Sequence, residues 1–185
     1  MPLLPSLPSP ARLSDLLRRF PAHAGPLLLH VDAVMKAGAP LSQAECELIA
    51  AYVSGLNACA FCHGSHRIYA EALGIEPGLI DALLDDPDTA HVDPKMRPLL
   101  AYIAKLNSLP SRLTPDDARA VLDAGWSEEA LYHAVQVCAL FNLFNRLVEG
   151  AGVDFAYAPG DDLTEADRSA DYRGFADRLG LTGPG

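Results

Sequence analysis

Apolar and polar residues alternate along most of the chain with the three-to-four-residue spacing of amphipathic helices. Helix-start signals precede several of these segments. Ser42-Gln-Ala-Glu45 matches a capping box, and Thr114-Pro115 places a proline in a first helical turn. No run of alternating β-branched residues predicts a strand, so the expected fold class is all-α. The pattern predicts helices over about 14–20, 26–36, 42–56, 59–74, 94–108, 127–149 and 164–179, with shorter ones after Pro77 and from Thr114.

The helical segments divide into one main domain and two flanking parts. Residues 1–24 are expected to form an N-terminal arm and a short helix, because prolines interrupt the first ten residues. Residues 25–155 hold the long amphipathic segments and are expected to form the main domain. Residues 156–185 are expected to form a linker and a C-terminal helix that packs on this domain or on a partner subunit.

The composition excludes several classes of function. A net charge of −10 argues against nucleic acid and anionic membrane surfaces as partners, since both require a basic face. No apolar segment approaches the roughly 20 residues of a membrane span, and the longest, 134–144, is interrupted by Gln136 and Asn142. The proline-rich start differs from a secretory signal, so we expect a cytoplasmic location. In that reducing compartment four cysteines are not expected to form a disulfide framework.

Two of the cysteines, Cys59 and Cys62, form a C-x-x-C motif that is followed by His66. Helical positions three and four apart share a face, so one face carries both thiols and the imidazole. The thiol spacing is compatible with a disulfide, and a helix start favours the thiolate. Glu47 lies in the preceding helix, and a short turn over 56–58 would bring it back toward His66 or the thiols. Together these residues supply a nucleophile, a base and an orienting carboxylate.

This arrangement resembles the alkylhydroperoxidase-D (AhpD) proteins of the carboxymuconolactone decarboxylase superfamily. Eleven residues separate Glu47 from Cys59, two separate the cysteines, and three separate Cys62 from His66. The letters Glu-Leu-Ile-Ala that begin at Glu47, and Val-Ser-x-x-Asn before the first cysteine, resemble the family as well. The segment 141–146, Phe-Asn-Leu-Phe-Asn-Arg, is similar to a later helix of its peroxidase-related branch.

The resemblance covers roughly residues 25–155 and implies an all-α, multi-helical AhpD-like bundle with the C-x-x-C motif at the start of a helix. It implies a peroxidase, since the decarboxylase branch lacks the cysteine pair. In the peroxidase branch the cysteine that matches Cys62 attacks the hydroperoxide and becomes a sulfenic acid. The cysteine that matches Cys59 resolves it to a disulfide, while His66 and Glu47 form the proton relay.

The implied partners are a small organic hydroperoxide, a dithiol reductant such as a lipoylated carrier protein, and further copies of the chain. The expected homo-oligomer is a trimer, a multiple of a trimer, or a dimer. The resemblance implies neither a cofactor nor a metal.

One position departs from the pattern of some family members, which carry a histidine immediately before the second cysteine. This chain has Phe61 there and His63 immediately after Cys62, so His63 is a candidate for a supporting role in the proton path. Phe61, Phe141 and Phe144 predict an apolar pocket, which would favour organic hydroperoxides over hydrogen peroxide.

Other polar residues near the motif are also candidates for supporting roles. Tyr52 and Ser54 are placed to hydrogen-bond the relay. Asn142 and Asn145 are polar groups in an otherwise apolar helix, and buried polar groups need partners, so they are expected to cap backbone or line the pocket. The remaining cysteines, 46 and 138, lie in apolar helical surroundings and are expected to be packing residues.

Other interpretations of the cysteine pair remain open. The pair could serve dithiol–disulfide exchange or redox sensing with low peroxidase activity. Two cysteines and two histidines, 63 and 66, are zinc-ligand types, as in an interaction module, but both histidines cannot point with the thiols from one helix without strain. The letters Cys-x-x-Cys-His also match the attachment motif of c-type haem, which requires export.

Overall fold

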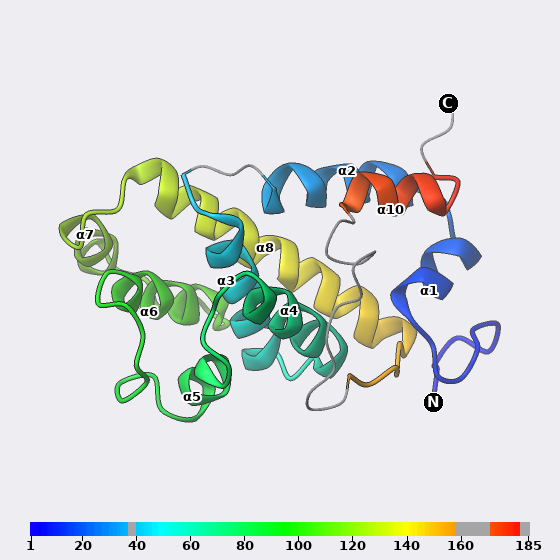
Figure 1. The fold of residues 1–185 in the computed structure, drawn as a ribbon, viewed down its shortest axis with the longest axis horizontal. Coiled ribbons are helices and arrows are strands. Elements are labelled where there is room, and N and C mark those ends of the chain that lie inside the picture. The colour runs from blue at the N-terminus through cyan, green and yellow to red at the C-terminus, as the bar shows by residue number, and fades with distance from the viewer. Residues whose placement is uncertain (37–39, 158–170, 182–185) are drawn as a thin grey trace.

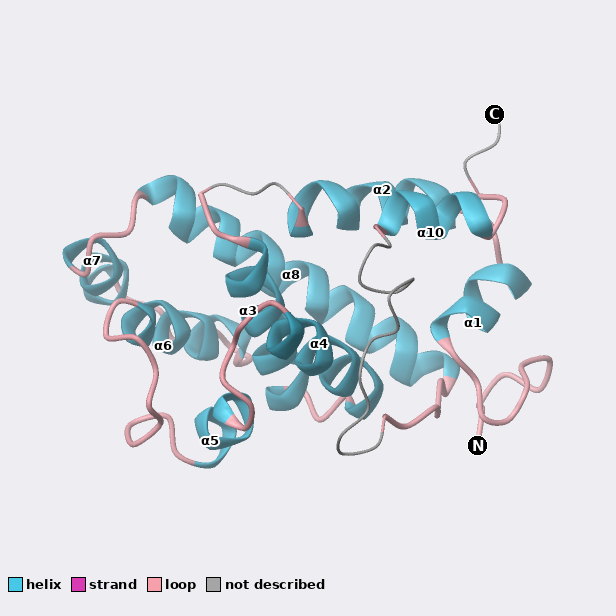
Figure 2. Ribbon diagram, in the orientation of Figure 1, coloured by secondary structure: helices cyan, strands magenta, loops and turns pink. Residues whose placement is uncertain are grey.

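The computed structural model describes residues 1–36, 40–157 and 171–181. In these ranges the chain forms nine helices and no strand, so the all-α prediction is confirmed (Figures 1 and 2). The helices are α1 (Leu13–Arg19), α2 (Ala24–Met35), α3 (Gln43–Leu56), α4 (Ala60–Ala72), α5 (Leu79–Asp85), α6 (Met96–Asn107), α7 (Pro115–Asp123), α8 (Glu128–Ala151) and α10 (Tyr172–Arg178).

The two helix-start signals in the sequence form as predicted. At the start of α3, the Ser42 hydroxyl accepts from the backbone N–H of Glu45, and the Glu45 carboxylate accepts from the backbone N–H of Ser42 at 2.7 Å. At the start of α7, the Asp117 carboxylate accepts from the backbone N–H of Thr114 at 2.8 Å. These bonds satisfy N–H groups that have no partner within the helix.

Helix α3 is the centre of the core. It contacts α4, α8, α5 and α6, and nine of its residues in succession, 46–54, are buried. Helix α8 has 24 residues, which corresponds to a length of about 36 Å, and it runs behind α3 and α4 through the middle of the molecule (Figure 1). None of the helices in the described ranges combines the length and the apolar character of a membrane span.

Several helix boundaries differ from the sequence prediction by a few residues, and two of them concern the last two described helices. Helix α8 continues through Gly150 and ends at Ala151, and Gly152, with a left-handed backbone (φ +70°), forms the C-cap. The sequence offers two glycines, and only the second adopts the conformation that stops a helix. The last described helix starts at Tyr172, with Asp171 as its N-cap; the predicted cap at Thr164 lies outside the described residues.

Helix α10 lies along α2 of the same chain, although the two are far apart in sequence (Figure 1). Ala176 of α10 forms a small second core with Leu17, Ala24 and Leu28. The same packing places the start of α10 beside the main bundle.

The two glycines at the end of α8 allow a matched test of stability. We expect Gly152→Ala to lower the free energy of unfolding by about 2 kcal/mol or more, because the left-handed conformation alone costs a non-glycine residue about 1–2 kcal/mol. In addition, a Cβ there would lie 2.2 Å from the backbone nitrogen of Leu3. Gly150→Ala, where a Cβ meets nothing within 4 Å, should instead stabilise by about 0.5–1 kcal/mol. Urea unfolding of both variants measures the difference, and equal midpoints would contradict the assignment of the C-cap.

Candidate active site

The turn between α3 and α4 positions the two thiols. Asn57 ends α3, Ala58 takes a left-handed conformation (φ +55°), and the backbone N–H of Cys59 donates to the carbonyl of Ser54 at 2.9 Å. Cys59 is thus the N-cap residue of α4, and Cys62 lies in its first turn. The N-terminal end of a helix favours negative charge, so the turn places both sulfurs where a thiolate is stabilised.

Glu47 and His66 meet across the α3–α4 contact. The Nδ1 atom of His66 lies 2.5 Å from Oε2 of Glu47, and both side chains are buried, at 8% and 2% exposed. The imidazole packs edge-on against the ring of Phe141, with ring centroids 4.4 Å apart. If Nδ1 donates to the carboxylate, Nε2 is the nitrogen left to exchange a proton with a bound molecule.

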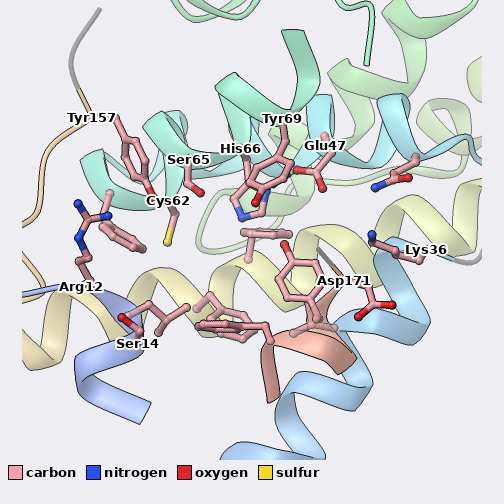
Figure 3. Close-up of a pocket in the computed structure, with 18 of the residues that line it drawn as sticks. Arg12, Ser14, Lys36, Glu47, Cys62, Ser65, His66, Tyr69, Tyr157 and Asp171 are labelled. Carbon is pink, nitrogen blue, oxygen red and sulfur yellow. Dashed lines mark hydrogen bonds and ion pairs between the residues drawn. The ribbon is translucent and has the colours of Figure 1, made fainter. Parts of the chain in front are cut away.

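A pocket of about 540 Å³ lies between the main bundle and α1, α2 and α10. Cys62, His66 and Glu47 lie along one wall of it (Figure 3). Cys59 has no exposed surface and does not line the pocket. The lining is rich in aromatic residues, namely Phe61, Tyr69, Phe141, Phe144, Tyr157, Tyr172 and Phe175. All three phenylalanines that predicted an apolar pocket are therefore part of its lining.

The two thiols ionise as a pair. Both are in the free form. Hydrogen bonding to Cys62 lowers the pKa of Cys59, and the same interaction, together with burial, raises the pKa of Cys62. The first proton is therefore lost more readily at Cys59, and loss of the second is strongly disfavoured.

His63 faces away from the pocket. Its Nδ1 atom lies 3.1 Å from the backbone oxygen of Ala51, and its Nε2 atom lies 3.5 Å from the Asp81 carboxylate of α5. His63 and His66 thus point to different neighbours. In the part of the chain that the structure describes, no group of three or more histidine, cysteine, aspartate or glutamate side chains is arranged to hold a metal ion.

The other supporting candidates occupy three different environments. Tyr52 is buried in the core, where burial raises its pKa, and it does not line the pocket. Asn145 is buried and donates to the Ser54 hydroxyl at 3.0 Å. Asn142 lies farther along α8 and donates to the side chain of Asn107 at 2.7 Å. Of these candidates, Asn145 and Ser54 are the ones that the fold brings to the thiols.

Several residues of the site carry no signal in the sequence. Arg12 of the N-terminal segment and Tyr172 and Phe175 of α10 line the pocket, and Glu149 lies near Cys59. Burial and the nearby Glu47, Tyr69 and Cys62 raise the pKa of Tyr172 well above its usual value, so it is a neutral phenol in the pocket wall. These residues lie far in sequence from the C-x-x-C motif, and only the tertiary fold brings them to it.

Comparison with solved structures identifies the fold, whereas no family model and no curated protein sequence matches the chain. The described residues form an all-α architecture with a pocket that Cys62 lines. An uncharacterized peroxidase-related protein with an AhpD core from Ralstonia eutropha JMP134 superposes with a TM-score of 0.70 at 22% identity, over 76% of this chain and 74% of that one. A protein of unknown function from Agrobacterium tumefaciens, whose suggested role is that of the antioxidant defence protein AhpD, superposes with a TM-score of 0.66 at 18% identity, over 78% and 97%. The chain therefore has the fold of the AhpD-like, peroxidase-related proteins.

A protein with a different activity has a similar fold. The debrominase Bmp8, solved as a C82A variant in complex with 2,3,4-tribromopyrrole, superposes with a TM-score of 0.66 at 15% identity, over 90% of this chain and 81% of that one. The fold alone therefore does not select one reaction.

The ionisation of the four cysteines predicts which of them reacts with a thiol reagent. Burial raises the pKa of Cys46 to about 12 and that of Cys138 to about 11. At pH 8 the thiolate fraction is then roughly one part in ten thousand and one in a thousand, respectively. We expect iodoacetamide to modify the Cys59–Cys62 pair first, because the pKa of Cys59 is lowered and its partner Cys62 lines the pocket. Peptide mapping after partial labelling tests this, with urea-denatured protein as the control in which all four react; rapid labelling of Cys46 or Cys138 would contradict it.

Proposed function

We propose that the protein is a thiol-dependent peroxidase that reduces organic hydroperoxides through a Cys59–Cys62 disulfide cycle. The observation that carries the proposal is the pocket wall that holds Cys62, together with the His66–Glu47 pair at 2.5 Å. A nucleophile and a proton donor thus face the same cavity. The peroxidase-related names of proteins with the same fold add support.

The reaction follows from the positions of these groups. The Cys62 thiolate attacks one oxygen of the hydroperoxide, the O–O bond breaks, and Cys62 becomes a sulfenic acid. The departing alkoxide takes a proton from His66, which the Glu47 carboxylate holds in orientation, and leaves as the alcohol. Cys59, which precedes Cys62 by three residues at the start of α4, then attacks the sulfenic sulfur, which releases water and forms the disulfide. An external dithiol restores both thiols.

The aromatic lining favours an organic hydroperoxide over hydrogen peroxide, because burying its apolar part contributes to binding. The reductant is proposed to be a dithiol, such as a lipoyl group on a carrier protein. Assembly into a homo-oligomer and a cytoplasmic location belong to the same proposal.

A second candidate is reductive dehalogenation of an aromatic ring. Seven aromatic side chains line the pocket beside a dithiol, and a debrominase has the same fold. In that reaction the two thiols supply two electrons, the ring exchanges its halogen for hydrogen, halide leaves, and a disulfide forms. Assaying halide release from a bromopyrrole alongside peroxide reduction separates the two functions. If the protein turns over neither substrate but reacts with disulfides, dithiol–disulfide exchange is the remaining candidate function.

The roles of the two cysteines are tested by their variants. Treating reduced protein with one equivalent of cumene hydroperoxide should form the Cys59–Cys62 disulfide much faster than a simple thiol control is oxidised. Cys62→Ser should abolish peroxide consumption. Cys59→Ser should allow one oxidation and then overoxidation to a sulfinic acid, because no neighbouring thiol traps the sulfenic acid. Intact mass and peptide mapping over time follow each product. Cys138→Ala is the control, and unchanged turnover in either site variant would refute the cycle.

The proton relay is tested by removing each partner. We expect His66→Asn to slow disulfide formation by about 10²–10⁴-fold, the range for loss of a general acid or base. Glu47→Gln should also slow disulfide formation, but less than His66→Asn does, because the imidazole stays in place and loses only its carboxylate partner. His63→Asn is the matched control on the same helix, since its ring faces α5, and it should retain most of the rate. Equal losses in the His63 and His66 variants would contradict the relay.

A further inference from the structure

The charged side chains that line the pocket are mostly basic, although the chain as a whole is acidic. The whole chain has 14 lysines and arginines against 24 aspartates and glutamates. Among the lining residues that the structure describes, basic side chains instead outnumber acidic ones. The basic ones are Arg12, Arg18, Lys36 and Arg178, and the acidic ones are Glu47 and Asp171. A protein with a net charge of −10 repels anions overall, so basic side chains gathered at one pocket mark a place where an anion is attracted.

Both acidic side chains of the lining already have partners within the protein. The Glu47 carboxylate lies 2.5 Å from the imidazole of His66. The Asp171 carboxylate accepts from a backbone N–H in the first turn of α10 and caps that helix. In residues 1–36, 40–157 and 171–181, no carboxylate forms an ion pair with Arg12, Arg18 or Arg178. The positive charge of these three arginines is therefore not neutralised by the described part of the protein.

Arg12 is held in place by stacking on an aromatic ring. Its guanidinium carbon lies 3.4 Å from the centroid of the Phe155 ring. The backbone of the two segments is joined as well, since the N–H of Phe155 donates to the carbonyl of Ala11 at 3.0 Å. Stacking occupies a face of the guanidinium and leaves the N–H groups in its plane for a hydrogen-bond acceptor. An arginine fixed in this way is preorganised for a carboxylate, because two parallel N–H groups match the two carboxylate oxygens.

The stacked arginine lies at the Cys62 end of the pocket. The ring of Phe155 contacts that of Tyr157, with centroids 5.1 Å apart, and the ring of Tyr157 contacts that of Phe61 at 5.7 Å. Phe61 directly precedes Cys62 in α4. Figure 3 shows Arg12 and Cys62 at the same end of the pocket. A molecule that presents one group to Cys62 can therefore present another to Arg12.

We propose that the substrate is a hydroperoxide that also carries a carboxylate, and that Arg12 binds this carboxylate. The hydroperoxide group faces Cys62, and the apolar body of the molecule lies against the aromatic lining. The inference rests on the proposed function for the hydroperoxide group, whereas binding of the acid does not depend on it.

The size and charge of the pocket suit such an amphipathic acid. A volume of about 540 Å³ falls within the roughly 300–1,000 Å³ of sites that hold drug-sized ligands, so the pocket has room for more than a small alkyl hydroperoxide. The exposed Arg18 and Arg178 add positive charge to the lining, which raises the rate at which an anion encounters the pocket.

The binding of two molecules of nearly the same shape tests the proposal without any reaction. 4-Isopropylbenzoate is ionised at pH 7.5, and 4-isopropylbenzamide is its neutral counterpart. In calorimetric titrations of the reduced protein, we expect the benzoate to bind about tenfold more tightly, because hydrogen bonds to a charged group are the stronger ones. Equal affinities, or tighter binding of the amide, would overturn the proposal.

Variants of two arginines near the start of the chain assign the carboxylate site. Arg12→Gln should remove the preference for the benzoate, whereas Arg12→Lys, which keeps the cation but loses the paired donors, should retain part of it. Arg19→Gln is the matched control for charge, since the exposed Arg19 stacks on Phe20 and does not line the pocket. The control should keep the full preference. A preference that persists in Arg12→Gln, or that is lost equally in Arg19→Gln, would refute the assignment to Arg12.

A kinetic comparison separates this inference from the proposed function. Cumene hydroperoxide and its para-carboxylate differ only in the acid group, and with dithiothreitol as reductant the carboxylate should have a kcat/KM about tenfold higher. A protein that prefers the benzoate but reduces neither hydroperoxide would refute the proposed function alone. A protein that reduces both hydroperoxides with equal kcat/KM and shows no preference for the benzoate would refute the carboxylate site alone.

Discussion

The α3–α4 turn fixes the relative positions of all the reacting groups. It brings Glu47 on α3 opposite His66 on α4, and it starts α4 at Cys59. The left-handed Ala58 costs about 1–2 kcal/mol for a residue that is not glycine. Bonds from the Cys59 backbone to Ser54 and from the side chain of Asn57 to its two asparagine partners offset this cost. The strained residue persists because hydrogen bonds on both sides of it hold the turn.

Burial gives these groups their chemical character. A carboxylate with 2% exposure is stable only when it is paired, and the imidazole of His66 supplies that partner. The same low exposure strengthens the bond between them, since little water competes for either group. The thiols share this environment, where a second negative charge is strongly disfavoured. The site therefore holds one charge on the dithiol and one hydrogen-bonded acid–base pair, side by side.

The features that the sequence predicted are local ones. The capping box at Ser42 depends on residues three apart, and the shared face of Cys62 and His66 depends on residues four apart, so periodicity is enough to find both. Predicting the Glu47–His66 contact required only one further assumption, that a short turn joins the two helices. The hydrogen bond between Asn57 and Asn145 could not be predicted, since the two residues are 88 positions apart and an asparagine has no preferred partner. The contribution of α10 to the pocket was missed for a related reason, because a short polar helix does not indicate which surface it covers. The end of α8 was misplaced because two glycines lie two residues apart and the sequence does not show which one is left-handed.

The pocket wall is made by parts of the chain that have separate tasks. The central helices α3 and α4 carry the thiols and the relay, whereas α1 and α10 contribute lining residues and none of the reacting groups. Tyr172 and Phe175 can therefore be replaced without altering the bonds that orient Cys62 and His66. In evolutionary terms, ligand preference and reactivity are encoded in different stretches of the gene. Mutations in the α10 segment can thus explore new substrates while the redox chemistry of the central helices is retained.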